Sequence, residues 1–375
     1  MTVLVVTAFA QDALSVPENR SSQPPCAGAT SLDEKVAFLG RPGSYGLPAG
    51  DVVRRETHMS WVFLAGDEAY KLKKPVRFPY LDFSTLSRRE QACRAELALN
   101  RRLAHDVYKA VAPVVRTSRG LSIGGPFGES DEIVDWLVVM RRLDPTGTLE
   151  HAMETRSLAA WQLDRLLSTL AAFYRHATPV LIAPESHLRS WRQSLAFNRR
   201  ILLDARLDLP AGLVRQVDRI QARFLTKQSA LIASRVRGRH IVDGHGDLRP
   251  EHIWLGDPVK IIDCLEFNAG LRAVDPFDEI AFLCLECERL GCAWAAEHIR
   301  RRACHVLLPD GLSDELFAFY RSHRAALRAR LSAAHLLEPN PRTPEKWQRL
   351  ARTYLQLAWD DARRLDRFLN TPSDR

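Results

Sequence analysis

The spacing of hydrophobic and polar residues divides the chain into two parts. Between residues 51 and 140, short apolar runs are bounded by turn residues, which is typical of β-strands. After Arg142 the apolar residues recur three and four positions apart along long segments, which is typical of amphipathic helices. The sequence therefore predicts a small part that contains a sheet, followed by a larger, mostly helical part.

The first part is expected to hold strands and one main helix. Gly66-Asp67 is expected to form a turn that joins the strands at residues 60–64 and 69–73 into an antiparallel hairpin. The helix is expected to start near Ser84 or Ser87, since Ser87 and Glu90 have the spacing of a capping box, and to end near His105. The predicted strands are residues 51–55, 60–64, 69–73, 111–117, 121–123 and 133–140.

The second part is expected to consist of helices with one interruption. Two short strands, residues 254–255 and 259–262, flank the turn Gly256-Asp257-Pro258, and the densest polar cluster of the chain surrounds them. The predicted helices are residues 158–176, 188–207, 211–234, 277–290, 294–307, 314–337 and 344–369.

A length of 375 residues suits two lobes. We expect a leader at residues 1–30, where Ser, Pro, Asn and Gly are frequent, an N-terminal lobe at 31–143 and a helical C-terminal lobe at 144–375. The first residues lack the basic region of a signal peptide, and no segment reaches about 18 apolar residues. We therefore expect a cytoplasmic protein with no membrane partner, and the oligomeric state stays open.

The net charge of +8 does not by itself predict a nucleic-acid partner, because the arginines are spread through the helical segments. The seven cysteines are odd in number and unevenly spaced, which favours a reducing compartment. Cys284 and Cys287 fit one apolar face of a helix, so we do not expect them to bind zinc.

Two motifs carry the chemistry, HGDLRPEHI at residues 245–253 and IIDCLE at residues 261–266. Phosphoryl transfer needs a carboxylate that takes the proton of the acceptor hydroxyl, and oxygen ligands that hold Mg²⁺ on the phosphates. Asp247 is the candidate base and Asp263 the candidate metal ligand. No GxxxxGK[ST] loop occurs, so a P-loop is not expected.

These motifs, followed by DPFDEIAFL, resemble the aminoglycoside phosphotransferase and choline kinase type of small-molecule kinase. The segments THMSWVF, YKLKKPV and LDFSTL resemble those of a subgroup of uncharacterised bacterial phosphotransferase-like proteins. The resemblance implies an α+β, bilobal protein-kinase-like fold. It also implies that the γ-phosphate of ATP or GTP is transferred to a hydroxyl with the help of Mg²⁺.

One residue departs from this family pattern. The family usually has Asn five residues after the catalytic Asp, whereas this chain has His252, and imidazole is a poorer Mg²⁺ ligand than an amide oxygen. We keep His252 as a candidate for catalysis and for metal binding, and His245 as a catalytic candidate. The alternative function is a nucleotide-binding pseudokinase with a regulatory role.

In the first part, Lys71 lies in the third expected strand, where a kinase has its phosphate-binding lysine, and Lys73 is the alternative. A helix glutamate holds that lysine in kinases. We favour Glu96 over Glu90, because the capping box already explains Glu90.

Other nucleotide contacts are expected from the first hairpin and from the end of the last strand. Thr57 or Ser60 occupies the place of a glycine-rich loop and could bind phosphate. Met140 and Arg141 resemble the hinge that accepts the adenine edge through main-chain groups.

The acceptor is not identified by the sequence. Residues 188–234 carry many more Arg than Asp or Glu, which favours a neutral or anionic metabolite such as a sugar or sugar acid over an aminoglycoside. Glu266, Asn268 and Arg272 are the candidates for acceptor contact. Asp278 resembles a residue that supports the catalytic loop in this family.

Overall fold

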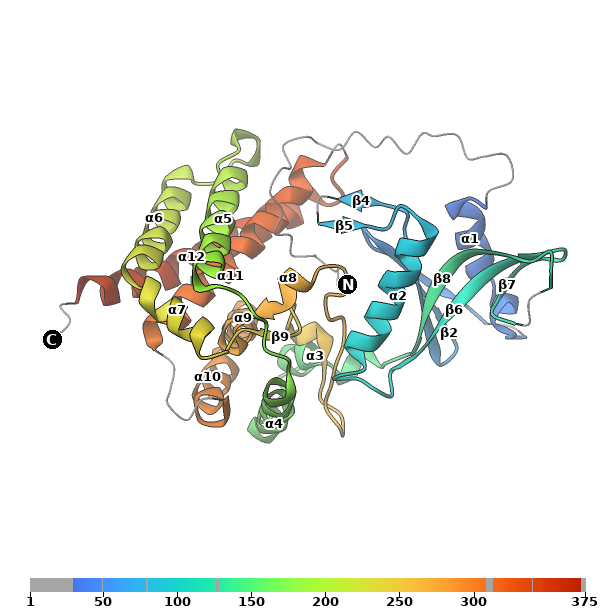
Figure 1. Ribbon diagram of the computed structural model, residues 1–375, viewed down its shortest axis with the longest axis horizontal. Coiled ribbons are helices and arrows are strands. Elements are labelled where there is room, and N and C mark those ends of the chain that lie inside the picture. The colour runs from blue at the N-terminus through green and yellow to red at the C-terminus, as the bar shows by residue number, and fades with distance from the viewer. Residues whose placement is uncertain are drawn as a thin grey trace. The chain divides into compact units, whose positions relative to one another are not determined.

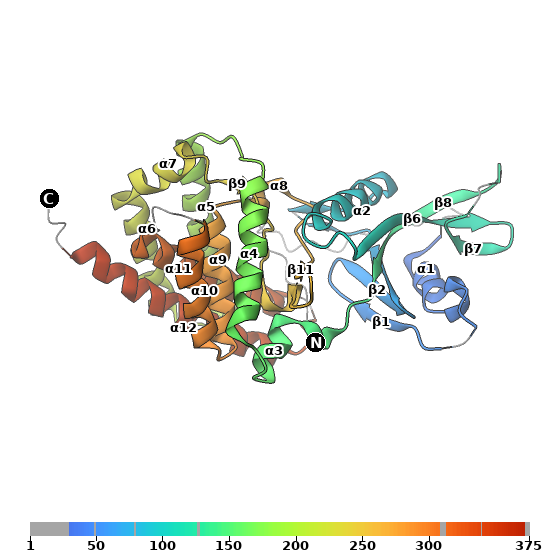
Figure 2. The same ribbon diagram turned by 90° about the horizontal axis from the view of Figure 1, so that it is seen from below.

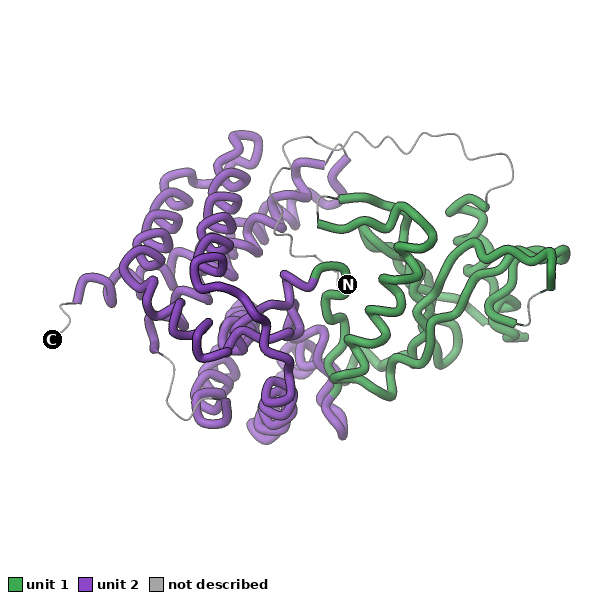
Figure 3. Tube along the Cα trace, viewed as in Figure 1, with its two compact units in different colours: residues 1–4, 12–147, 260–268 green, residues 5–11, 148–259, 269–375 purple. Residues whose placement is uncertain are grey.

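The computed structural model describes residues 30–48, 50–78, 80–125, 128–307, 313–338 and 340–371. The predicted leader therefore lies outside the described residues, apart from Thr30. The described residues form two compact units, coloured green and purple in Figure 3. Unit 1 contains residues 30–147 and 260–268, and unit 2 contains residues 148–259 and 269–371.

Unit 1 is built on a six-stranded antiparallel sheet with the strand order β1-β2-β3-β8-β6-β7 (Figure 1). Each of the six predicted strands is present, with ends shifted by up to three residues. The strands are β1 (Val53–Glu56), β2 (Ser60–Ala65), β3 (Glu68–Lys73), β6 (Tyr108–Thr117), β7 (Gly120–Ile123) and β8 (Glu132–Arg141).

The two faces of this sheet pack against different helices. Leu72 of β3 and Leu137 of β8 are register partners and pack with Leu39 of helix α1 (Leu32–Leu39). The next pair, Lys71 and Val138, points to the other face, because side chains alternate along a strand. On that face Val138 packs with Cys93 of helix α2 (Leu86–Asn100), which lies beside β6 in Figure 2.

Helix α2 starts at Leu86, near the predicted Ser84 or Ser87, but its capping residue and its end differ from the prediction. Thr85 is the N-cap residue, with its hydroxyl accepting the Arg88 N–H, and Ser87 lies inside the first turn. The capping box predicted for Ser87 and Glu90 is therefore wrong, and the helix ends at Asn100 rather than near His105. Helix α1, which the sequence reading did not predict, begins with a capping box of Ser31 and Glu34.

Unit 1 also contains short elements. They are the 3₁₀ helices Pro42–Tyr45 and Pro145–Gly147, the antiparallel pair β4 (Arg77–Phe78) and β5 (Leu81–Asp82), and β11 (Lys260–Ile261).

Unit 2 is mostly helical. Its helices are α3 (Leu149–Glu154), α4 (Ala160–His176), α5 (Pro184–Leu202), α6 (Ala211–Lys227), α7 (Ser229–Arg237), α8 (Ala269–Arg272), α9 (Pro276–Arg289), α10 (Ala293–Leu307), α11 (Asp314–Ala334) and α12 (Pro344–Asn370). Its other elements are β9 (Val242–Asp243), β10 (Ile253–Trp254), β12 (Ala273–Val274) and the 3₁₀ helices Ala205–Leu207, Pro250–His252 and His335–Leu337. Strand β9 pairs with β12 in antiparallel fashion.

The single helix predicted for residues 211–234 is wrong, because the backbone of Gln228 leaves the helical conformation and separates α6 from α7. The predicted helix at 188–207 starts earlier, at Pro184, and ends at Leu202. Cys284 and Cys287 are buried in α9, as expected, and burial raises the pKa of the Cys284 thiol to about 12.

Helix α11 is the centre of unit 2. Every residue from Leu316 to Ala333 is buried, and α5, α6, α9 and α12 pack around it. Two of its buried arginines pair with carboxylates of neighbouring helices. Arg324 forms two hydrogen bonds of 2.8 and 2.6 Å with Asp278 of α9, and Arg321 donates to Asp361 of α12 at 3.0 Å. Buried charges are tolerated when they are paired in this way.

The α+β fold class predicted from the sequence is confirmed, since an antiparallel sheet with one main helix is followed by a mostly helical unit. None of the helices within the described residues combines the length and the apolar character that a membrane span requires.

Candidate functional site

A cluster of two lysines and three carboxylates lies on the α2 side of the sheet in unit 1. Lys71 Nζ is 2.8 Å from Glu96 Oε1 and 3.2 Å from Asp263 Oδ1. Lys73 Nζ is 2.6 Å from Glu96 Oε2 and also pairs with Glu266. Glu96 is thus shared by both lysines, and each lysine reaches one carboxylate of the IIDCLE segment.

Strand and helix periodicity produce this cluster. Lys71 and Lys73 are two residues apart on β3, so both side chains project from the same face. Glu96 belongs to the buried stripe of α2, together with Arg89, Cys93 and Asn100. Glu90 instead pairs with Arg94 on the exposed side of the helix, at 2.9 Å.

The charges of this cluster stabilise one another in a buried setting. Burial alone would lower the pKa of Lys71, but Asp263 and Glu96 outweigh burial and raise the pKa well above its usual value. Burial would likewise raise the pKa of Glu96, yet Lys71 and Lys73 lower it. Both lysines are therefore cations at neutral pH, and Glu96 is an anion.

Asp263 has an unusual backbone conformation, with φ of 66° in the left-handed region. A non-glycine residue rarely adopts this conformation, and it persists only where the surroundings hold it. The N–H of Asp263 donates to Tyr108 Oη at 3.2 Å, and the N–H of Cys264 donates to Asn100 Oδ1 at 2.9 Å. Side chains of β6 and α2 thus hold the backbone on both sides of the carboxylate.

The hydroxyl predicted to touch phosphate at Thr57 is engaged within its own turn. Thr57 Oγ1 accepts the N–H of Ser60 at 2.9 Å and donates to the Ser60 carbonyl at 3.0 Å. Ser60 is buried at the start of β2. The two residues close the turn that joins β1 to β2.

At the other predicted nucleotide contact, Met140 is partly buried in β8 and is the register partner of Ala69 and Tyr108. The Arg141 N–H donates to the Val107 carbonyl at 2.8 Å. The Arg141 guanidinium pairs with Asp106 at 2.6 Å.

In unit 2 the HGDLRPEHI motif forms the loop between β9 and β10. Asp247 is buried, with 1% of its surface exposed, and its Oδ1 has no hydrogen-bond partner within the described part of the chain. Its Oδ2 lies 3.9 Å from both Arg249 Nη1 and His252 Nδ1. One carboxylate oxygen in this loop is therefore buried without a protein donor.

The two histidines of the motif contact the backbone of Asp247. His245 Nδ1 accepts the Asp247 N–H at 3.3 Å, and His252 Nδ1 is 3.0 Å from the Asp247 carbonyl oxygen. Because a carbonyl oxygen only accepts, this contact places a proton on Nδ1 of His252.

Glu279 holds this loop, and the sequence reading missed it. Its carboxylate accepts the N–H of His245 at 3.0 Å and also the N–H of Gly246, and Tyr174 Oη donates to it at 2.7 Å. Asp278, the predicted supporting residue, pairs with Arg324 instead. The sequence contained a signal for this role, because Glu279 directly follows Asp278 in the DPFDEIAFL motif.

The three residues predicted to contact the acceptor are not brought together within one unit. Glu266 belongs to unit 1 and pairs with Lys73, and the half-buried Asn268 ends the same segment. Arg272 belongs to unit 2, where its Nε lies 2.7 Å from Asp243 Oδ1. Glu266 and Arg272 thus already have charged partners.

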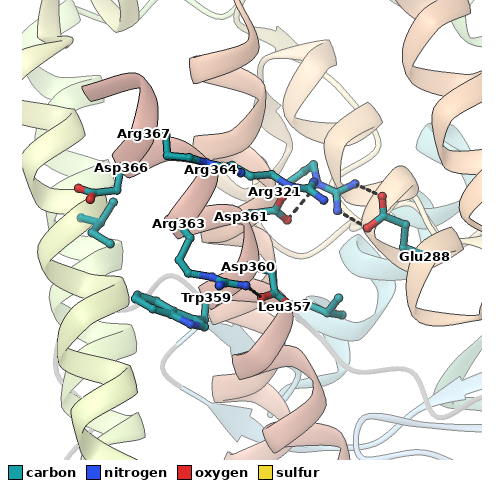
Figure 4. A pocket seen from close by; sticks show the side chains of 11 residues that line it. Glu288, Arg321, Leu357, Trp359, Asp360, Asp361, Arg363, Arg364, Asp366 and Arg367 are labelled. Carbon is teal, nitrogen blue, oxygen red and sulfur yellow. Dashed lines mark hydrogen bonds and ion pairs between the residues drawn. The ribbon is translucent and has the colours of Figure 1, made fainter. Parts of the chain in front are cut away.

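A pocket of about 680 Å³ lies among α6, α9, α11 and α12 of unit 2 (Figure 4). Arg321 pairs there with Glu288 at 3.1 Å and with Asp361 at 3.0 Å. Arg363 pairs with Asp360 at 2.8 Å. The residues that line this pocket include none of the predicted site residues. The guanidinium groups of Arg321 and Arg363 are already neutralised by the carboxylates named above.

The sequence relatives of this chain are longer proteins, of which only part aligns with it. It is 32% identical over 294 residues to uncharacterized proteins of Mycobacterium tuberculosis and Mycobacterium bovis. The aligned part is 76% of this chain and 56% of those proteins, so the chain spans about half the length of the curated relatives it matches. No protein-family model matches the chain.

Several solved structures are similar to the chain. A choline/ethanolamine kinase family protein from Mesorhizobium loti is 16% identical, with a TM-score of 0.49 over 91% of this chain and 95% of that one. Choline kinase from Cryptosporidium parvum is 10% identical, with a TM-score of 0.49 over 90% and 97%. An aminoglycoside phosphotransferase from Streptomyces rimosus is 16% identical, with a TM-score of 0.42 over 78% and 98%.

Proposed function

We propose that this protein is a small-molecule kinase of the aminoglycoside phosphotransferase and choline kinase type, which transfers the γ-phosphate of ATP or GTP to a hydroxyl of a small metabolite. The observation that carries this proposal is the position of Lys71, whose Nζ lies between Glu96 at 2.8 Å and Asp263 at 3.2 Å. A buried lysine held by a helix glutamate, next to a carboxylate that can bind Mg²⁺, is the arrangement that phosphoryl transfer uses.

In this proposal unit 1 binds the nucleotide. Lys71 contacts a phosphate oxygen while Glu96 holds the ammonium group in place, and Asp263 holds Mg²⁺, with His252 as a second candidate ligand. The donor chemistry fits, because a carboxylate oxygen is the ligand that Mg²⁺ prefers. Mg²⁺, when bound, neutralises charge on the phosphates.

Unit 2 supplies the base. The acceptor oxygen forms a bond to the γ-phosphorus as the bond from that phosphorus to the nucleoside diphosphate breaks, and the hydroxyl proton passes to Asp247. The buried Oδ1 of Asp247, for which the described residues offer no donor, is the oxygen suited to accept that proton. Glu279 keeps the loop in shape by holding two of its N–H groups.

For the acceptor we propose a neutral or anionic metabolite. Residues 188–234, which include most of α5 and all of α6, carry eight arginines and only three aspartates. The arginines at positions 189, 192, 200, 215 and 219 are exposed. A surface of this charge disfavours a polycation and attracts an anion.

The test is ADP release from Mg-ATP with sugars, sugar acids, amino alcohols and aminoglycosides as acceptors. One acceptor class should raise ADP release by the wild-type protein. Asp247→Asn should reduce kcat by about 10²- to 10⁴-fold, the usual contribution of a general base, while nucleotide binding stays intact. Asp360→Asn, which changes a carboxylate of α12 paired with Arg363, is the matched control and should leave kcat unchanged.

The outcomes separate the two candidate functions. ADP release that is equal in the wild type and in Asp247→Asn would contradict the proposed base. Nucleotide binding without ADP release for any acceptor would instead favour the pseudokinase, and His252→Asn would then be measured to see whether activity appears.

A further inference from the structure

Lys73 is a second buried lysine that the proposed phosphate contact does not use. It is 0% exposed, and its ammonium group contacts Glu96, Glu266 and the face of the Phe83 ring, with Nζ 4.9 Å from the ring centroid. A buried ammonium group is costly unless carboxylates compensate it. The two carboxylates that do so come from α2 and from the segment that carries Asp263.

That segment, residues 260–268, is held to the rest of unit 1 on one side by its main-chain N–H donors. The N–H of Ile261 donates to the Leu103 carbonyl at 3.3 Å, and the Asp263 and Cys264 N–H groups donate to side chains of β6 and α2. On the β3 side, two ion pairs hold it, Lys71 with Asp263 and Lys73 with Glu266.

These two ion pairs respond differently to the ligand of the proposed function. When Lys71 binds phosphate and Asp263 binds Mg²⁺, both groups take new partners, and their mutual ion pair weakens. Lys73 is buried and Glu266 is partly buried, and the proposed step gives neither of them a new partner. Lys73–Glu266 then remains as the ionic tie between β3 and the segment, three residues from Asp263.

The backbone conformation of Asp263 gives such a tie a role beside the main-chain contacts to Tyr108 and Asn100. A non-glycine residue in the left-handed region costs on the order of 1–3 kcal/mol and is kept only by its surroundings. If the tie from β3 were lost, the segment could relax toward an ordinary conformation and the carboxylate would turn away from its position.

We propose that the Lys73–Glu266 ion pair is a positioning device that keeps the Asp263 carboxylate oriented for Mg²⁺ while Lys71 binds phosphate. This inference rests on the proposed function of the site. It assigns Lys71 and Lys73 different tasks, and it assigns Glu266 to metal positioning rather than to acceptor contact.

The test compares Lys73→Met, Glu266→Gln and the double variant with the wild type. Each single variant should raise the Mg²⁺ concentration for half-maximal activity by roughly 10- to 100-fold, the usual effect of losing a residue that orients a metal ligand. Nucleotide affinity in EDTA should change by less than about threefold, and the double variant should be no worse than either single variant.

Two controls make the test specific. Lys71→Met should weaken nucleotide binding even in EDTA, and Lys109→Met, which removes a more exposed ion pair to Glu68, should change neither quantity. Lys73→Arg keeps the charge and should restore most of the Mg²⁺ response. Amide exchange of residues 260–268 should rise in Lys73→Met, with residues 108–117 as the internal reference.

Three results would overturn the proposal. Lys73→Met could weaken nucleotide binding in EDTA as much as Lys71→Met does, which would make Lys73 a phosphate ligand. The Mg²⁺ response could stay unchanged, or the effects of the two single variants could simply add. Failure of the proposed function would appear in the wild type itself, as absent nucleotide binding, and would remove both proposals.

Discussion

Buried carboxylates decide the shape of the HGDLRPEHI loop at the scale of single residues. Glu279 is 0% exposed and accepts main-chain N–H groups of His245 and Gly246. Gly244 is required beside it, because an added Cβ would lie 2.8 Å from Glu279 Oε2 and 2.5 Å from Val274 Cγ2. Glu279 therefore holds the loop that presents Asp247 through the main chain of His245 and Gly246.

Replacing this carboxylate tests that inference. Glu279→Gln keeps the size of the side chain but replaces one acceptor oxygen with a donor, so at least one N–H loses its partner. We expect the free energy of unfolding to fall by about 1–3 kcal/mol and kcat to fall at least tenfold. Nucleotide affinity, which the proposed function assigns to unit 1, should change by less than about twofold.

Urea unfolding and steady-state kinetics provide the measurements. Glu297→Gln, at a residue whose side chain is 64% exposed on α10, is the control and should stay within about 0.5 kcal/mol of the wild type. A Glu279→Gln variant with wild-type stability and kcat would show that the loop holds its shape without this contact.

At the scale of elements, α2 links the sheet to the lysine cluster. Its buried stripe places Glu96 against Lys71 and Lys73, and places Asn100 against the N–H of Cys264. Thr85 rather than Ser87 is the residue that caps this helix.

Two alanine substitutions distinguish the caps. Thr85→Ala removes the acceptor for the Arg88 N–H and should destabilise the protein by about 1 kcal/mol, the usual cost of losing an N-cap. Ser87→Ala changes a residue inside the helix and should have an effect below about 0.5 kcal/mol. Thermal unfolding of both variants is the measurement, and a larger loss for Ser87→Ala would contradict the observed start of α2.

At the scale of the whole molecule, the chain crosses between units more than once. It leaves unit 1 after Gly147, returns for Lys260–Asn268 and enters unit 2 again at Ala269. Unit 1 is therefore discontinuous in sequence, and the carboxylates of Asp263 and Glu266 reach Lys71 and Lys73 from about 190 residues away.

This division predicts how unit 1 behaves alone. A chain that ends at Gly147 lacks two carboxylate partners of its buried lysines, so it should unfold at a lower temperature than unit 1 with residues 260–268 attached through a long Gly/Ser linker. Differential scanning fluorimetry of the two chains gives the comparison. Equal melting temperatures would show that the segment does not belong to unit 1.

Local patterns of hydrophobic and polar residues were sufficient to locate the strands of the main sheet and most of the helices. Strand and helix periodicity arise from neighbouring residues, so the six strands of the main sheet of unit 1 could be placed from the sequence within three residues. Helix ends were harder, as the cap of α2 and the break at Gln228 show, since competing caps differ by small free energies.

The sequence by itself determined the candidates for phosphoryl transfer, Asp247 and Asp263 in their two motifs and Lys71 in a strand, because these depend on residue type and short spacing. Only the tertiary structure decided that Glu96 is shared by two lysines, that Lys73 pairs with Glu266, and that Glu279 rather than Asp278 holds the loop. These contacts join side chains 23 to 193 positions apart, and no local preference of the chain specifies them.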